Sequence, residues 1–80
     1  MKPLQHPIIF LEEKIHRKNN QLLIKFEYDE TLISLVRTVS GASWSKSLKA
    51  WYLINTAENL SIILNLFKNI SKVDVSKISK

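Results

Sequence analysis

The segment QLLIKFEY, residues 21–28, alternates apolar and polar side chains. Four large apolar residues recur at every second position and share one side: Leu22, Ile24, Phe26 and Tyr28. A period of two places successive side chains on opposite faces of a β-strand. The pattern therefore predicts a strand with one buried face, to which Leu23 is the exception.

The residues before this strand predict a partner for it. Residues 8–16 are rich in β-branched and aromatic side chains, although they alternate less regularly. Arg17, Lys18, Asn19 and Asn20 then form a polar connection, and asparagine tolerates the left-handed backbone of tight turns. Together these features predict a β-hairpin.

Two later segments have the apolar spacing of helices. In the first, Asp29 is a predicted N-cap and Gly41, the only glycine, is a predicted C-cap. The second begins with Asn55 and Glu58 at the spacing of a capping box. The apolar residues of the two helices are Leu32, Ile33, Leu35, Val36 and Val39, and then Leu60, Ile63, Leu64, Phe67 and Ile70.

A second hairpin is predicted between the helices, where Trp44 and residues 50–54 flank a basic turn. Beyond Ser71 the alternation is weak, and residues 71–80 are expected to form either an edge strand or a linker. The predicted order is β-β-α-β-β-α, an α+β fold with a small antiparallel sheet and its helices packed on one face. Residues 1–70 are expected to form one domain.

Composition limits the class of protein. Eighty residues suffice for one small core, and no cysteine is present, which excludes disulfides, thiolate metal sites and cysteine nucleophiles. The formal net charge is +5 and the pI about 9.7, which favours nucleic acid as a partner. The alternative is that a modest positive charge only maintains solubility.

No membrane or export segment is expected. The longest apolar stretches are far shorter than the roughly 20 residues of a membrane helix. The first residues also lack the apolar region and cleavage site of a signal peptide. We therefore expect a cytoplasmic protein.

The polar residues do not assemble into a catalytic pattern. His6 and His16 lack the spacing of a metal site. Glu12 and Glu13 are adjacent, so on a strand they point to opposite faces and cannot act as a carboxylate pair. A single glycine excludes a glycine-rich phosphate loop. We expect no enzymatic activity, no cofactor, no metal and no small-molecule substrate.

One group of residues has the chemistry of a nucleic-acid surface. Trp44, Trp51 and Tyr52 are interleaved with Lys46 and Lys49. Aromatic rings stack on bases or sugars, while lysines contact phosphates. The competing interpretation is that both tryptophans belong to the core of so small a domain.

A second basic group lies at the first turn, where Arg17 and Lys18 could reach phosphate together with Lys14, Lys25 or Arg37. Such a charge run is otherwise a solvated turn. If both hairpin tips lay on one edge of the sheet, they would form one basic rim. The predicted DNA contacts are Arg17, Lys18, Lys25, Lys46, Lys49 and Tyr52.

A resemblance to a known family rests on three short motifs: GASWSK at residues 41–46, KAWY at 49–52 and NTAENL at 55–60. They resemble the N-terminal module of phage-type and transposon-type integrases of the tyrosine-recombinase family, particularly in Bacteroidetes. Residues 24–28 and 32–36 are similar to the strand and helix that precede these motifs. The likeness covers residues 20–70.

The resemblance implies a non-catalytic module that helps a bacterial recombinase engage double-stranded DNA, for instance at arm-type sites, in association with the nucleoid. Such recombinases continue into a core-binding domain and a catalytic domain, so the resemblance implies that this chain is a fragment of a longer recombinase. The main alternative is a protein-interaction or positioning domain that packs on the remainder of the recombinase, with Ile62 and Leu66 as candidate contacts. A related module of DNA-remodelling helicases matches less well.

Overall fold

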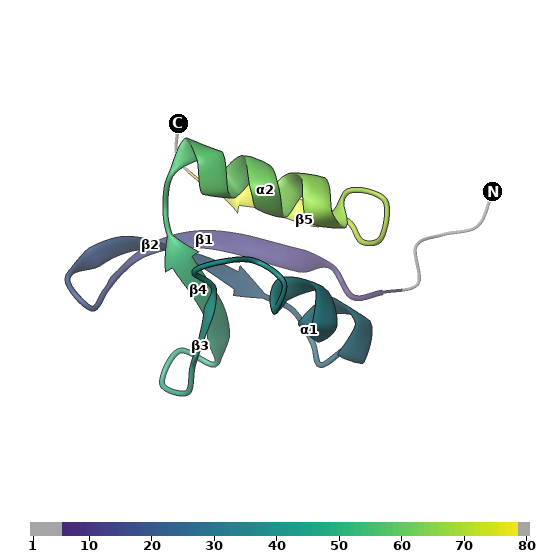
Figure 1. Ribbon diagram of the computed structural model, residues 1–80, viewed down its shortest axis with the longest axis horizontal. Coiled ribbons are helices and arrows are strands. Elements are labelled where there is room, and N and C mark those ends of the chain that lie inside the picture. Colours follow the sequence, from purple (N-terminus) through teal and green to yellow (C-terminus); the bar gives the residue numbers. More distant parts are fainter. Residues whose placement is uncertain (1–5, 79–80) are drawn as a thin grey trace.

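The computed structural model describes residues 6–78, which form one five-stranded sheet and two helices (Figure 1). Neither helix has the length and hydrophobicity needed to cross a membrane. In chain order the elements are β1 (Ile9–His16), β2 (Asn19–Lys25), α1 (Glu30–Val36), β3 (Ser43–Ser45), β4 (Ala50–Ile54), α2 (Ala57–Phe67) and β5 (Val73–Lys77).

The sheet has the strand order β3-β4-β2-β1-β5 and is mixed. Both predicted hairpins are present and antiparallel, and β2 also pairs antiparallel with β4. The expectation of a purely antiparallel sheet is wrong, because β5 pairs parallel with β1. The connection from β4 through α2 is a crossover, so β5 enters the sheet in the same direction as β4 and β1. Residues 73–77 are thus an edge strand, and the sheet extends past residue 70.

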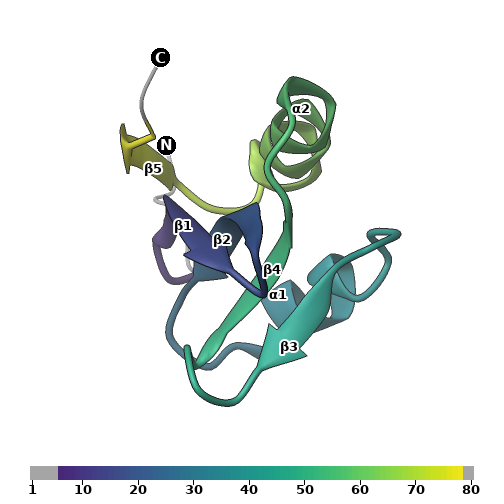
Figure 2. The same ribbon diagram turned by 90° about the vertical axis from the view of Figure 1, so that its left-hand side faces the viewer.

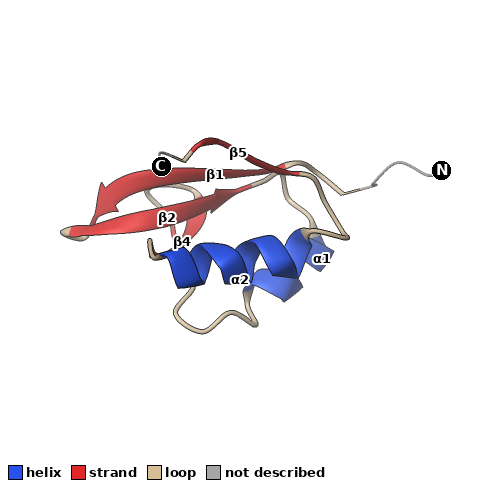
Figure 3. Cartoon of the chain, turned by 90° about the horizontal axis from the view of Figure 1, so that it is seen from above, coloured by secondary structure: helices blue, strands red, loops and turns tan. Residues whose placement is uncertain are grey.

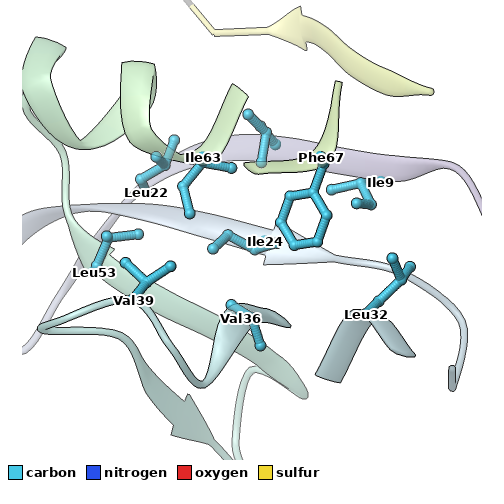
Figure 4. Packing of buried hydrophobic residues seen from close by; sticks show 10 residues of the cluster. Ile9, Leu22, Ile24, Leu32, Val36, Val39, Leu53, Ile63 and Phe67 are labelled. Atoms are coloured by element: carbon cyan, nitrogen blue, oxygen red, sulfur yellow. The ribbon is translucent and has the colours of Figure 1, made fainter. Parts of the chain in front are cut away.

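Both helices lie on the same face of the sheet (Figure 3). From that face, Phe67 of α2 projects between Ile9 and Ile24 (Figure 4). The opposite face of the sheet, which we call the open face, has no helix over it within residues 6–78. Figure 2 shows the helices to one side of the twisted strands. The buried core consists of Ile9, Leu11, Leu22, Ile24, Leu32, Val36, Val39, Leu53, Ile63 and Phe67.

Strand β2 is shifted towards the N-terminus relative to the predicted strand at 21–28. It starts at Asn19, because the turn before it uses only Arg17 and Lys18, and it ends at Lys25. Phe26 still packs against the core, but Tyr28 is 77% exposed, because the chain leaves the sheet to enter α1. Leu23 faces the open side and is nevertheless buried.

The first helix starts where predicted and ends earlier. Asp29 is its N-cap, and its side chain accepts a hydrogen bond from Leu32 N at 2.9 Å. The helix ends at Val36 with Arg37 as its C-cap, so the assignment of Gly41 to that role is wrong. Val39 is buried from the turn that follows, and Gly41 adopts a φ of 90° on the way to β3. The turn that leads into β3 therefore needs a residue with a left-handed backbone at position 41, whereas the end of α1 does not.

The N-cap of α2 is Thr56 rather than Asn55. The Thr56 hydroxyl accepts a hydrogen bond from Asn59 N at 3.0 Å. The Asn55 amide instead donates to Glu13 Oε2 at 2.9 Å and so links the start of α2 to β1. Residue 70, predicted to continue the helix, lies beyond its end at Phe67.

Substitution of Ile63 tests the packing of α2 on the sheet. Ile63 is fully buried, so Ile63→Val is expected to lower the free energy of unfolding by about 1 kcal/mol through the lost methylene and the small cavity left behind. Ile62 on the same helix is 44% exposed, and Ile62→Val should change stability by less than about 0.5 kcal/mol. Urea denaturation of the two variants measures the difference, and equal losses would contradict this packing.

Asp29 is expected to make the fold sensitive to acid. The hydrogen bond donated by His6 Nδ1, at 2.9 Å, together with that from Leu32 N, lowers the pKa of Asp29. A depressed carboxyl pKa stabilises the fold above the unfolded value of about 3.9, and this stabilisation is lost as the pH falls through the folded value. An asparagine at this position would still cap the helix without titrating, so the melting temperature of Asp29→Asn should fall less than that of the parent between about pH 5 and about pH 2. Parallel melting curves over that range would refute the assignment.

Candidate nucleic-acid interface

The β1–β2 hairpin ends in a two-residue turn made of Arg17 and Lys18. Their φ angles are 56° and 68°, and the flanking residues His16 and Asn19 are paired across the two strands. Two successive left-handed residues are the signature of the type I′ turn, which normally selects Asn-Gly. Here both positions are basic and exposed, and the hairpin projects beyond the rest of the sheet (Figure 1).

Tyr52 lies on the open face near the base of this turn. Its ring meets that of His16 edge-on, with centroids 4.9 Å apart and planes at 85°. Gln21, which is 4% exposed, donates a hydrogen bond from Nε2 to the His16 carbonyl at 3.1 Å. Tyr52 is half-buried and already in contact with a neighbouring ring, so its first role is to pack the open face.

The turn between β3 and β4 carries the second basic pair, Lys46 and Lys49. Ser45 organises this turn, because its Oγ accepts a hydrogen bond from Leu48 N at 3.2 Å and lies 3.2 Å from Ser47 Oγ. Lys49 has a φ of 54°. Both lysines are exposed, and no described acidic residue forms an ion pair with them.

The two basic turns lie at opposite ends of the sheet and do not form one rim. Ile54, at the end of β4, pairs with Gln21 next to the first turn, whereas Trp51, near the start of β4, pairs with Ile24 at the far end of β2. The rise of a strand separates the turns by roughly 20 Å. Figure 1 shows them as two separate projections.

Lys25 differs from the other predicted contacts. It lies on the open face, and its Nζ is 3.4 Å from the Glu12 carboxylate on the neighbouring strand. A partly exposed pair of this kind is weak, but it partly neutralises the charge that Lys25 would offer to phosphate. Lys25 therefore differs from the four basic residues of the turns both in position and in having an acidic partner.

The two tryptophans differ in burial, and only one of them contributes to the core. Trp44 lies on the edge strand and is 50% exposed, whereas Trp51 is partly buried and packs against the core. Their rings meet at 62° with centroids 5.7 Å apart. The interpretation of both as core residues is correct only for Trp51.

Sequence patterns missed one residue of this region, Tyr28. With Trp44, Trp51, Phe26 and Lys49 it lines a small pocket beside α1. Tyr28 donates a hydrogen bond to Glu30 at 3.3 Å, and the negative charge of Glu30 raises the pKa of the phenol. The available signal was Asp29, since a helix cap directly after Tyr28 leaves no room for the strand to continue.

Within residues 6–78, no group of three or more histidine and acidic side chains is placed to bind a metal ion. No protein-family model, curated protein sequence or solved structure matches this chain.

Replacement of Lys18 tests whether its backbone conformation costs stability. Glycine adopts positive φ without steric penalty, so Lys18→Gly is expected to raise the free energy of unfolding by about 1 kcal/mol. Lys18→Ala removes the same charge but keeps Cβ, and should give no such gain. Urea denaturation distinguishes strain from charge: equal effects of the two variants would show that φ is not the cause.

Proposed function

We propose that this chain is a non-catalytic DNA-binding module of a site-specific integrase of the tyrosine-recombinase type. Its contacts to double-stranded DNA are phosphate contacts from the two turns, with Arg17 and Lys18 at one end of the sheet and Lys46 and Lys49 at the other. Strand cleavage and rejoining belong to the remainder of the recombinase. The resemblance of residues 20–70 to integrase N-terminal modules and the net charge of +5 support this proposal.

One observation carries the proposal. Within residues 6–78, the non-glycine residues with positive φ are Arg17, Lys18 and Lys49, and all three are basic. Glycine or asparagine would occupy such positions at lower energy. Backbone strain of this kind concentrates at functional sites. At the tips of both hairpins the chain therefore carries positive charge at positions where another residue type would cost less energy.

The spacing of the turns suits a duplex. A projecting two-stranded ribbon is one of the elements that the major groove, about 12 Å wide, admits. With Arg17 and Lys18 at the groove, a second basic turn roughly 20 Å away would reach the phosphate backbone beyond it. Only the four basic side chains of the turns contact the duplex, so binding should depend on DNA phosphates rather than bases and should weaken with salt. The expected dissociation constant of the isolated module is about 10⁻⁴ to 10⁻⁶ M.

A second candidate function is docking of the open face on another part of the recombinase. Phe10 and Ile54 lie on that face and are 43% and 46% exposed. These exposed apolar groups, together with half-buried Tyr52, give the face the mixed character of a protein contact. This candidate predicts chemical-shift changes on the open face with protein partners and none with DNA.

Charge reversal at the first turn tests the proposal. Arg17→Glu with Lys18→Glu is expected to weaken binding to a short duplex at least about ten-fold at low salt, because attraction to two phosphates is replaced by repulsion. The slope of log K against log salt concentration should fall by about 1 for each phosphate that the protein no longer neutralises. Fluorescence anisotropy of labelled DNA at several salt concentrations measures both quantities.

The matched control is Lys68→Glu with Lys72→Glu. These lysines lie at the far end of α2 and just before β5, and their reversal changes net charge by the same amount. The control should lose much less affinity than the turn variant. Equal losses would mean that only net charge matters, and absence of binding by the parent at low salt would leave the docking function.

A further inference from the structure

The pocket beside α1 combines aromatic rings with a cation. Trp44, Trp51, Tyr28 and Phe26 line it together with Lys49, and we call it the aromatic pocket. The residues come from β3, β4, the turn before β4, and the segment between β2 and α1. These parts of the chain therefore converge on one site at the sheet end that carries Lys46 and Lys49.

Two of these rings are far more exposed than packing requires. Tyr28 is 77% exposed and Trp44 is 50% exposed. Trp44 meets Trp51 edge-on at an inclination of 62°, so the two rings are not stacked face to face. Large aromatic rings left uncovered beside a hollow are typical of binding surfaces.

A positive and a negative side chain lie at different sides of the aromatic pocket. Lys49 lines the pocket from the β3–β4 turn, with the left-handed backbone described above. Glu30 lies on the Tyr28 side, where it accepts the phenol hydrogen bond. An anionic group of a ligand would therefore be favoured at Lys49 and disfavoured at Tyr28. A planar ring with a phosphate on one side meets both conditions.

The size of the pocket restricts the ligand further. Its volume is about 150 Å³. Sites for drug-sized ligands measure about 300–1,000 Å³, so this hollow suits a single ring system. Bases within an intact duplex are stacked and cannot enter it, whereas an unpaired or extruded base can.

We propose that the aromatic pocket binds one unpaired nucleobase of DNA, stacked on Trp44 and Tyr28, with the adjoining phosphate at Lys49. This inference rests on the proposed DNA-binding function and specifies which DNA the module prefers. A duplex with an extruded base, or a single strand, binds more tightly than a matched duplex. The basic turn at Arg17 and Lys18 contributes to all of these complexes alike.

Intrinsic fluorescence reports on the pocket directly, because Trp44 and Trp51 are the only tryptophans of the chain and both line it. The experiment titrates the full 80-residue chain with three DNAs: a short matched duplex, the same duplex with one extra unpaired base, and one of its single strands. We expect quenching by the second and third, and an affinity for them roughly five-fold or more above that for the matched duplex.

Trp44→Ala is expected to remove this preference, with a roughly five-fold or larger loss for the DNAs that carry an unpaired base and little change for the matched duplex. Tyr28→Ala provides a second test at a residue with little packing to lose. Phe10→Ala is the matched control, because Phe10 is also exposed but lies on the open face. Affinities of these variants are measured by anisotropy of labelled DNA.

The outcomes separate this inference from the proposed function. Equal affinity for all three DNAs, or a preference unchanged in Trp44→Ala and Tyr28→Ala, overturns the base-binding inference while DNA binding stands. Absence of binding to every DNA at low salt overturns both. Loss of the preference in Phe10→Ala as well would assign it to the open face and also overturn the inference.

Discussion

Strand β2 is hydrogen-bonded on both sides, to β1 and to β4, and three successive residues of it, Leu22, Leu23 and Ile24, are at most 1% exposed. Burial of consecutive strand residues requires cover on both faces of the sheet. The helices cover Leu22 and Ile24, while the cross-strand neighbours of Leu23 are Glu12 and Tyr52. A slip of one residue in either pairing would reverse the faces, so this strand fixes the register of the whole sheet.

The position of the basic turns follows from the same strand. Because β2 runs antiparallel to both β1 and β4, the turn at Arg17 and Lys18 and the turn that contains Lys49 leave the sheet at opposite ends. The second turn thereby comes to lie beside the segment that leads from β2 into α1. Charge and exposed aromatic rings meet at that end, whereas the projecting first turn offers charge alone.

Local preference and core packing compete in the first hairpin. A turn centred on Asn19 and Asn20 would suit asparagine better than the observed turn suits arginine and lysine. The observed register instead pairs Leu11 with Ile24, and Ile9 lies beside Phe67 in the core (Figure 4). Buried apolar contacts outweigh the strain of two left-handed residues, since each large buried side chain contributes about 1.5–3 kcal/mol and each left-handed residue costs about 1–2 kcal/mol.

Local sequence patterns correctly predict the α+β class, both hairpins, the approximate positions of both helices and the cap at Asp29, because period and capping chemistry are local properties. Three features are visible only in the folded chain: the parallel pairing of β5, the separation of the basic turns, and the exposure of Tyr28 and Trp44. These features depend on which strands become neighbours and where the chain leaves the sheet. Such choices are made by packing between segments distant in sequence, which no local pattern records.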